Sequence, residues 1–176
     1  MAATPWNLDK SHSGITFSVR HMMITNVRGS FNDFDATVSA DTNDLTGLSA
    51  TLTIDVNSID TKDAGRDGHL KSPDFFNVEQ FPQISFVKTA LASKGGDDYA
   101  LTGDLTIAGV TKSVTLNAEI SGPAKDPWGN TKLGVVADGV ISRADFGLTW
   151  NAALETGGFL VGDAIKVHIE LEFAQA

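Results

Sequence analysis

Histidine is the side chain in this sequence with the widest choice of chemistry, as a metal ligand or as a general acid and base. The chain has four histidines, which are His12, His21, His69 and His168. No pair shows the i, i+4 or short-loop spacing that is typical of zinc ligands. On one continuous strand, His12 and His21 would face opposite sides, because an odd number of residues separates them. The sequence therefore predicts no metal site.

Carboxylates gather between Ser58 and Phe86, where two of them could act as a general acid and base. They alternate there with basic residues, in the order Asp60, Lys62, Asp63, Arg66, Asp67, Lys71 and Asp74. Mixed charges of this kind are typical of a solvated, salt-bridged surface. The sequence also lacks a G-x-S-x-G elbow, a P-loop and a G-x-G-x-x-G motif after a strand. We therefore expect no catalytic residues, and the alternative is an enzyme that uses His69 with Asp67, or His21.

The same stretch interrupts an otherwise regular pattern. Nearly every other long segment alternates apolar and polar residues, whereas residues 58–86 combine charges, glycines, prolines and a Phe-Phe pair. We expect a short helix from Asp63 to Leu70, with Asp60 or Thr61 as its N-cap. If the flanking strands close into a barrel, this crossover lies over one rim. It then serves either as a lid on a binding site or as a plug on the core.

The rest of the chain predicts an all-β fold. Alternation is clearest over residues 15–21, 48–56, 99–107, 114–120, 133–141 and 165–173. About eight such strands, joined by short turns, are typical of a sandwich or an up-and-down barrel. Gly29 and Gly103 lie inside strand patterns, which predicts a bend in the wall or a side chain packed closely against each glycine.

Composition narrows the class of protein. The chain has 176 residues, of which 41% are hydrophobic, and this suits one domain over residues 1–176. The sequence shows no apolar run long enough to span a bilayer, no signal peptide and no cysteine. We therefore expect a cytoplasmic protein, or a periplasmic or secreted one if a leader has been trimmed. The net charge of −9 argues against nucleic acid as a partner and against docking on anionic lipid headgroups.

Seven blocks of sequence, in order along nearly the whole chain, resemble one known family. They are D-x-x-H-S-x-I-x-F-x-V-x-H (9–21), V-x-G-x-F (27–31), I-D-T-x-x-x-x-R-D-x-H-L-x-S-x-D-F-F (59–76), F-P-x-I-x-F (81–86), G-D-L-T-I-x-G-V-T-K (103–112), I-S-R-A-D-F-G (141–147) and V-G-D (161–163). Together they resemble the YceI-like family, the bacterial polyisoprenoid-binding proteins. The resemblance implies an extended, lipocalin-like antiparallel barrel with a helical insertion, an apolar pore for a long isoprenoid, and often a homodimer. It brings no catalytic residues and no cofactor apart from the bound lipid.

We therefore predict an eight-stranded barrel that binds, and carries or stores, a polyisoprenoid or a quinone-like lipid. The expected pore-lining residues have the inward parity of their strands and are Phe17, Val19, Val27, Phe31, Leu52, Ile54, Phe86, Leu105, Ile107, Val114 and Leu116. The residues expected near a lipid headgroup at the mouth are Arg20, Arg28, Arg66, His69 and Arg143. Periodicity does not distinguish a hollow barrel from a filled one. The alternatives are accordingly a lipid-modifying enzyme that uses His69 and Asp67 or His21, and a stress-associated interaction protein with a filled barrel.

Overall fold

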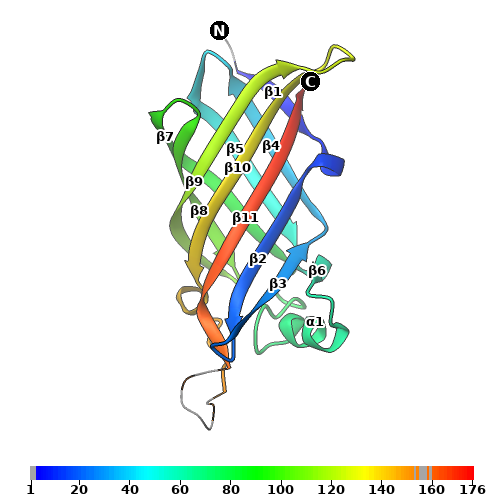
Figure 1. Ribbon diagram of the computed structural model, residues 1–176, viewed down its shortest axis with the longest axis vertical. Helices are drawn as coiled ribbons and strands as arrows, with labels where there is room; N and C mark the ends of the chain where they lie inside the picture. The colour runs from blue at the N-terminus through cyan, green and yellow to red at the C-terminus, as the bar shows by residue number, and fades with distance from the viewer. Residues whose placement is uncertain (1–2, 153, 155–157, 159) are drawn as a thin grey trace.

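The computed structural model describes residues 3–152, 154, 158 and 160–176. The strands of this part of the chain are β1 (Thr4–Leu8), β2 (Gly14–His21), β3 (Thr25–Phe31), β4 (Phe34–Asp41), β5 (Asp44–Asp55), β6 (Ile59–Asp60), β7 (Gln83–Gly95), β8 (Asp98–Ile107), β9 (Val110–Lys125), β10 (Thr131–Ser142) and β11 (Val161–Gln175). The helices are α1 (Ala64–Lys71) and the short 3-10 helices η1 (Lys10–His12), η2 (Val56–Ser58) and η3 (Arg143–Phe146). The strands form one antiparallel sheet that curls into an elongated barrel (Figure 1).

Eight of the described strands make the closed ring, in the order β1, β4, β5, β7, β8, β9, β10 and β11, with β11 paired back to β1. β1 and β2 lie end to end along β11, with Trp6 opposite Gln175 and Phe17 opposite Val167. β3 and β4 likewise follow one another, because β3 pairs with β2 and β4 pairs with β1. The break between them at residues 32–33 is where the alternation changes parity. The predicted eight-stranded antiparallel barrel with a short helical insertion is confirmed.

The two ends of the barrel are built differently. Both chain termini lie at one end, which is the upper end in Figure 1. At the lower end, β3 pairs with the two-residue strand β6 and not with β5, so the crossover over residues 59–82 completes the wall there. This region contains α1, which lies beside the lower rim (Figure 1). The predicted position of the crossover over a rim is therefore correct.

The helix α1 begins one residue later than predicted and has a different cap. Its N-cap is Asp63, whose carboxylate accepts a hydrogen bond from the Arg66 backbone N–H at 3.0 Å. The prediction of Asp60 or Thr61 as the cap is wrong, because Thr61 donates to the Asp67 carboxylate inside the helix. The helix has eight residues, and no helix in the described part of the chain is long and apolar enough to cross a membrane.

Large apolar side chains fill the upper half of the barrel. The buried residues of this part include Trp6, Leu48, Leu91, Ile120, Leu133 and Phe173. Trp6 and Phe173 are each only 2% exposed, and the strands that carry them are paired near the C-terminus. None of these residues lines the cavity described below. The interior is therefore closed at its upper end.

Gly29 and Gly103 each lie against an aromatic ring, as the sequence predicts. A Cβ atom at Gly103 would lie 2.4 Å from Phe86 Cζ and 2.6 Å from the Val87 carbonyl oxygen. A Cβ atom at Gly29 would lie 2.4 Å from Phe17 Cζ, and its three nearest atoms all belong to that ring. The two rings therefore cover the positions where side chains are missing from the wall.

Replacing Gly103 by alanine should lower the free energy of unfolding by about 1–3 kcal/mol, because backbone as well as a ring must move. Gly29→Ala should cost less, since only the end of the Phe17 side chain must shift. Gly134→Ala on β10 is the control, because no atom lies within 4 Å of the added Cβ. Urea unfolding of the three variants tests this order. Equal losses for the Gly103 and Gly134 variants would contradict it.

Candidate ligand-binding cavity

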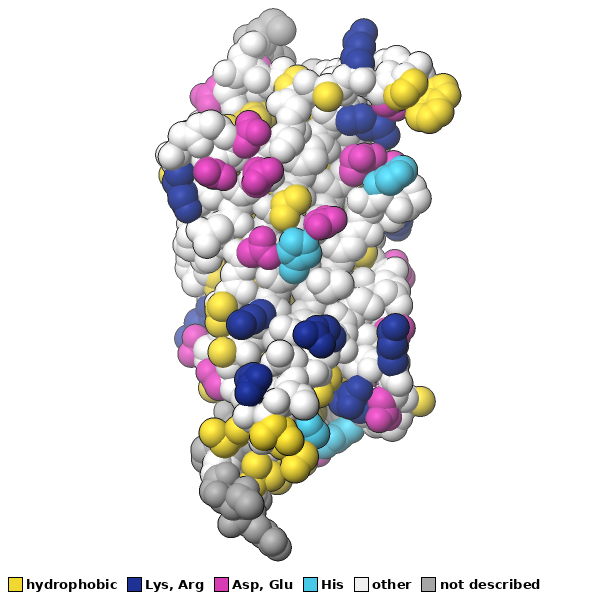
Figure 2. Space-filling view, viewed as in Figure 1, with side chains coloured by type: hydrophobic (Ala, Val, Ile, Leu, Met, Phe, Trp, Pro, Cys, Tyr) yellow, Lys and Arg dark blue, Asp and Glu magenta, His cyan; other side chains and the backbone are white. Residues whose placement is uncertain are grey.

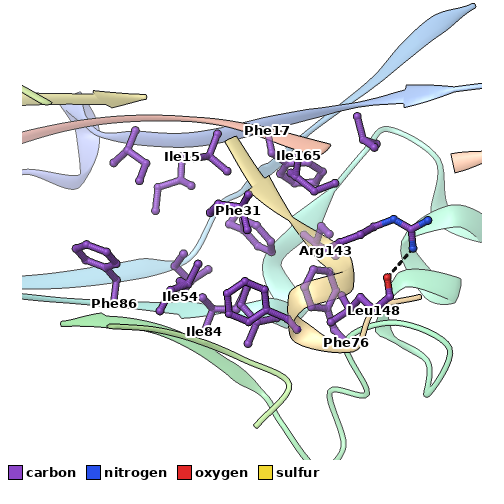
Figure 3. A pocket seen from close by; sticks show the side chains of 18 of the residues that line it. Ile15, Phe17, Phe31, Ile54, Phe76, Ile84, Phe86, Arg143, Leu148 and Ile165 are labelled. Carbon is purple, nitrogen blue, oxygen red and sulfur yellow. Dashed lines mark hydrogen bonds between the residues drawn. The ribbon is translucent and has the colours of Figure 1, made fainter. Parts of the chain in front are cut away.

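An apolar cavity of about 170 Å³ occupies the lower half of the barrel interior. Its walls come from β2, β3, β5, β7, β8, β9, β10 and β11, and its floor from the crossover and η3. Figure 3 shows the cavity with Phe86 toward one end and Arg143 and Phe76 toward the other. Apart from Thr16 and Arg143, every residue that lines it is hydrophobic.

Ten of the eleven predicted pore residues line this cavity, and only Val27 does not. Val27 pairs with Val19 across β2 and β3, and it lines a second hollow that is described below. The sequence prediction missed Ile165, Val167 and Ile169 of β11, although their parity matches that of the residues it included. It also missed the apolar side chains of the crossover, where no regular period indicates which side chains point inward.

The size of the cavity indicates what it can hold without rearrangement. An engineered apolar cavity of about 150 Å³ in another protein stays dry and binds benzene. A cavity of 170 Å³ therefore suits one small apolar group. Unfilled apolar space of this kind costs stability in folded proteins. A ligand that fills the space would offset part of this cost.

A second hollow, which we call the mouth pocket, lies below the cavity. It is lined by Phe17, Val19, Arg20, His21, Val27, Thr61, Arg66, His69, Leu70, Phe75, Trp150, Leu160 and Val161. The two spaces adjoin, because both are bordered by Phe17, Val19, Leu70, Phe75 and Val161. The mouth pocket is more polar than the cavity, since it is lined by two arginines, two histidines and a threonine.

Three aromatic rings, those of His69, Phe75 and Trp150, cluster in the mouth pocket, and Phe75 also lines the cavity. The ring centroid of His69 lies 5.1 Å from that of Phe75 and 4.7 Å from that of Trp150, and both contacts are edge-to-face. His69 Nε2 lies 2.9 Å from Asp74 Oδ2, which fixes the imidazole in place. Through Phe75, this ring cluster lies where the mouth pocket adjoins the cavity.

Three of the predicted headgroup residues, Arg20, Arg66 and His69, line the mouth pocket. Arg20 donates from Nη2 to the Met23 carbonyl oxygen at 2.8 Å. Arg66 donates to the hydroxyl and carbonyl oxygens of Thr61 at 2.9 and 2.8 Å. Both guanidinium groups keep further N–H donors that these bonds do not use.

Arg28 lies elsewhere, and the predicted pair of His69 and Asp67 does not form. Arg28 lines a groove on the outer face of the barrel, together with Lys62 and Lys166. The Asp67 carboxylate accepts from the Thr61 backbone N–H at 2.9 Å, and the partner of His69 is Asp74. The arrangement that an enzyme with His69 and Asp67 would require is therefore not present.

Arg143 lies at the floor of the cavity and is 8% exposed. Four of its five N–H groups donate to backbone carbonyls, namely those of Leu148, Trp150, Val161 and Gly162, at 2.7–3.3 Å. The bond to Leu148 is drawn in Figure 3. Burial lowers the pKa of this guanidinium, and the nearby Asp163 carboxylate opposes that shift. Arg143 therefore joins the segment after η3 to the start of β11, and little of it remains for a headgroup.

Replacing Arg143 by methionine should lower the free energy of unfolding by about 3 kcal/mol, because each buried carbonyl left without a donor costs about 1–3 kcal/mol. Arg20→Met is the matched control, since Arg20 is exposed and donates to a single carbonyl. Its effect should stay within about 0.5 kcal/mol. Urea unfolding measures both variants. If they lost the same stability, Arg143 would not be the structural link that its hydrogen bonds indicate.

The profile of the YceI-like domain matches residues 6–173. The chain belongs to the YceI-like family. A UPF0312 protein of Staphylococcus aureus (strain MSSA476) is 41% identical to it over 172 residues, which cover 97% of this chain and 98% of that relative. This identity runs through the whole barrel, so the blocks quoted from the sequence are part of a continuous relationship.

Solved structures resemble this YceI-like barrel along nearly its full length. BcnA of Burkholderia cenocepacia aligns with a TM-score of 0.82 and 26% identity, over 94% of this chain and 99% of that one. The YceI protein of Campylobacter jejuni aligns with a TM-score of 0.76 and 33% identity, over 89% and 90%. A polyisoprenoid binding domain from Saccharophagus degradans has a TM-score of 0.70 and 18% identity, over 97% and 98%. At that identity, the likeness shows a shared fold.

An ion-pair cluster lies near the upper end of the YceI-like barrel. Asp9, His12 and Glu172 offer ligand atoms that all lie within 4.8 Å of one another. Lys132 Nζ lies 3.6 Å from a carboxylate oxygen of Asp9 and from one of Glu172. Hydrogen bonds from Ser11 and His12 hold the pKa of Asp9 well below its usual value. The lysine therefore already offsets part of the negative charge of these carboxylates. The absence of a metal stays a prediction, and elemental analysis of the purified protein checks it.

His168 on the outer face of β11 should titrate at a higher pH than a free histidine. Its ring is hydrogen-bonded to Asp138 and Glu170, and these bonds raise its pKa above 6.5. The stability that they add is present below pH 6.5 and is lost as the pH rises through the raised pKa. The side chain is 43% exposed, so His168→Gln should cost under about 1 kcal/mol at acid pH and nothing at alkaline pH. An NMR titration that gave a pKa at or below 6.5 would contradict this.

Proposed function

We propose that this YceI-like protein binds the apolar tail of a lipid, of the polyisoprenoid or quinone-like class, in the barrel cavity. The observation that carries the proposal is an apolar cavity inside the wall, next to a mouth that holds Arg20, Arg66 and His69. Burial of ligand surface contributes about 25 cal/mol per Å². The fold shared with a polyisoprenoid binding domain supports this ligand class by analogy.

The tail enters from the lower end in this proposal. Trp6 and Phe173 are buried in the upper half, so the cavity has no opening at that end in this proposal. A long tail exceeds a cavity of 170 Å³ and needs rotamer changes of the rings that line it, with Phe17 and Phe86 free to leave their glycine contacts. The headgroup stays in the mouth pocket, where cations and a histidine can meet it.

Binding, rather than turnover of the lipid, is the function that the site supports. His69 is fixed between two aromatic rings and Asp74, and the carboxylate of Asp67 is engaged by Thr61. Neither group is placed as a free general base beside the cavity. Whether the bound lipid is carried or stored depends on its rate of exchange with membranes.

Extraction of the purified protein with organic solvent, followed by mass spectrometry, tests the proposal. We expect one lipid with an apolar tail per binding site. The delipidated protein should gain melting temperature when an isoprenoid is added, because a ligand that binds only the folded state stabilises it. A protein that is purified without lipid and shows no gain with any isoprenoid would refute the proposal.

Assembly and location are further expectations from the sequence and the family resemblance. We propose a homodimer, which sedimentation equilibrium measures directly. We also propose a cytoplasmic location for the chain, which fractionation of the source cells tests. Neither expectation changes how the cavity would hold its ligand.

A further inference from the structure

The turn between β2 and β3 exposes three consecutive apolar residues at the lower end of the barrel. Met22, Met23 and Ile24 are 42%, 60% and 71% exposed, and we call them the apolar tip. The Met22 backbone N–H donates to the Leu160 carbonyl at 2.7 Å, and Leu160 lines the mouth pocket. The apolar tip therefore lies at the rim of the mouth. Figure 2 shows hydrophobic side chains gathered at this end of the molecule.

The backbone of the tip does not account for its apolar residues. Met22 and Met23 have φ angles of 52° and 61°, in the left-handed region. Hairpin turns with these angles favour Asn-Gly, Asp-Gly or Gly-Gly, because side chains other than those of Gly, Asn and Asp are strained there. Two methionines at these positions weaken the turn and expose apolar surface to water. Such residues point to a role outside folding.

Cationic groups surround the tip, in a chain whose net charge is −9. Residues 14–31, which form β2, the turn and β3, contain Arg20 and Arg28 and no Asp or Glu. Lys166 and Arg28 both pair with Ser18 from opposite sides, so they lie close together on the outer face. We call Arg20, Arg28 and Lys166 the basic band. Figure 2 shows basic side chains in the lower half of this face and acidic ones concentrated in the upper half.

The acidic groups near the basic band already have partners. The groove that contains Arg28 and Lys166 also contains Asp60 and Asp138. Asp138 is bonded to His168, and Asp60 accepts from the Lys62 backbone N–H at 2.8 Å. The cations of the band therefore face outward without a carboxylate salt bridge among the described residues.

We propose that the lower end docks on the anionic surface of a lipid bilayer. The apolar tip enters the boundary between headgroups and acyl chains, and the basic band lies over the lipid phosphates. Total charge argues against such docking, but charges act over a screening length of about 8 Å, so the local distribution decides. The inference rests on the proposed function, since docking brings the mouth pocket to the membrane from which a lipid would enter.

Sedimentation of the full chain with vesicles tests the docking surface. The vesicles contain phosphatidylglycerol and phosphatidylcholine, with pure phosphatidylcholine as the uncharged comparison. The variant Met23→Ser/Ile24→Ser should lose at least about tenfold in vesicle affinity, because apolar burial is removed. Arg28→Gln should lose about fivefold, and only on the anionic vesicles. Trp128→Ser is the matched control, since Trp128 is 84% exposed on the β9–β10 turn, away from the mouth, and should bind normally.

A second variant separates docking from folding. Met22→Asn/Met23→Gly supplies residues that suit the left-handed backbone, so its melting temperature should not fall. Its vesicle affinity should still drop, as that of the serine variant does. Tip variants that bind vesicles like the wild type, or a loss of binding in Trp128→Ser, would overturn the proposal. A wild-type dimer that the tip variants dissociate, without any vesicle binding, would assign the tip to a second copy of the chain and overturn it too.

Measuring the lipid bound to the same protein samples distinguishes membrane docking from lipid binding in the cavity. Protein that carries lipid but never sediments with vesicles would overturn the docking surface and leave the proposed function standing. Protein that sediments through its tip but never holds lipid would support docking and refute the proposed function. Tip variants that bind lipid normally in solution, but load it from vesicles at least about tenfold more slowly, would support both.

Discussion

Replacing Leu105 by glutamate should abolish lipid binding while the protein remains folded. Leu105 lines the cavity and is 7% exposed, so its carboxylate would face the position of the lipid tail. An unpaired carboxylate in an apolar site is costly to bury. In the empty cavity water can enter beside it, whereas a bound tail excludes that water. Lipid titration should therefore show no binding, and circular dichroism should show an intact barrel.

Two matched variants separate the effect of a charge in the cavity from the effect of a charge on the surface and of a charge in the packed core. Val140→Glu places the same charge on the outer face of β10, where the side chain is 64% exposed and lies opposite Lys166, and should leave both binding and stability unchanged. Leu133→Glu places it in the filled upper half, at 3% exposure and away from the cavity. A carboxylate buried there without a partner should cost over about 4 kcal/mol or prevent folding. If Leu105→Glu also failed to fold, the lower half of the barrel would be packed as tightly as the upper half, and the prediction would be wrong.

Alternation in the sequence predicts which side of the wall a residue faces, and it does so reliably here. Phe17, Leu52 and Leu105 come from three separate strands, yet all three point into one cavity. This follows because a strand repeats every two residues whatever its place in the barrel. The fold could be predicted in the same way, from the number of alternating segments and the short turns that join them.

Height along the barrel could not be predicted, because it depends on how the strands are staggered. Leu133 and Phe173 have the same inward parity as the cavity residues, but they pack in the upper half and do not line the cavity. Val27 has the inward parity as well, and it lines the mouth pocket instead. A pattern of period two therefore identifies the interior of the barrel without showing which part of it is hollow.

The roles of charged residues were the least predictable part of the site. Arg143 carries the charge that a headgroup would need, but backbone carbonyls from residues 148–162 surround it. These carbonyls come together only in the folded chain, and no residue type in the sequence indicates that they will surround an arginine. The net charge likewise gives no information on the local distribution of charge, since residues 14–31 contain no carboxylate. Local sums of charge over single hairpins would have revealed that asymmetry.

Affinity for isoprenoids of a fixed headgroup should rise with tail length and then stop rising. Each buried CH₂ contributes about 0.8 kcal/mol at most, and the loss of rotational freedom in the tail reduces this gain. The rise must end because Trp6, Leu133 and Phe173 close the upper half, so a tail cannot emerge at the far end. Carbons beyond that length remain in the mouth pocket or in water.

The length at which the affinity levels off measures the depth of the site. Ile54→Trp adds a ring to the cavity wall and should move the levelling point to shorter tails, because it leaves less room. Val140→Trp is the control, since Val140 is 64% exposed on the outer face of β10, and its series should match that of the wild type. The series is measured by the rise in melting temperature of delipidated protein, with each ligand below its aggregation limit. Equal affinity for short and long tails would show that the headgroup alone is recognised, and the cavity would then have no part in binding.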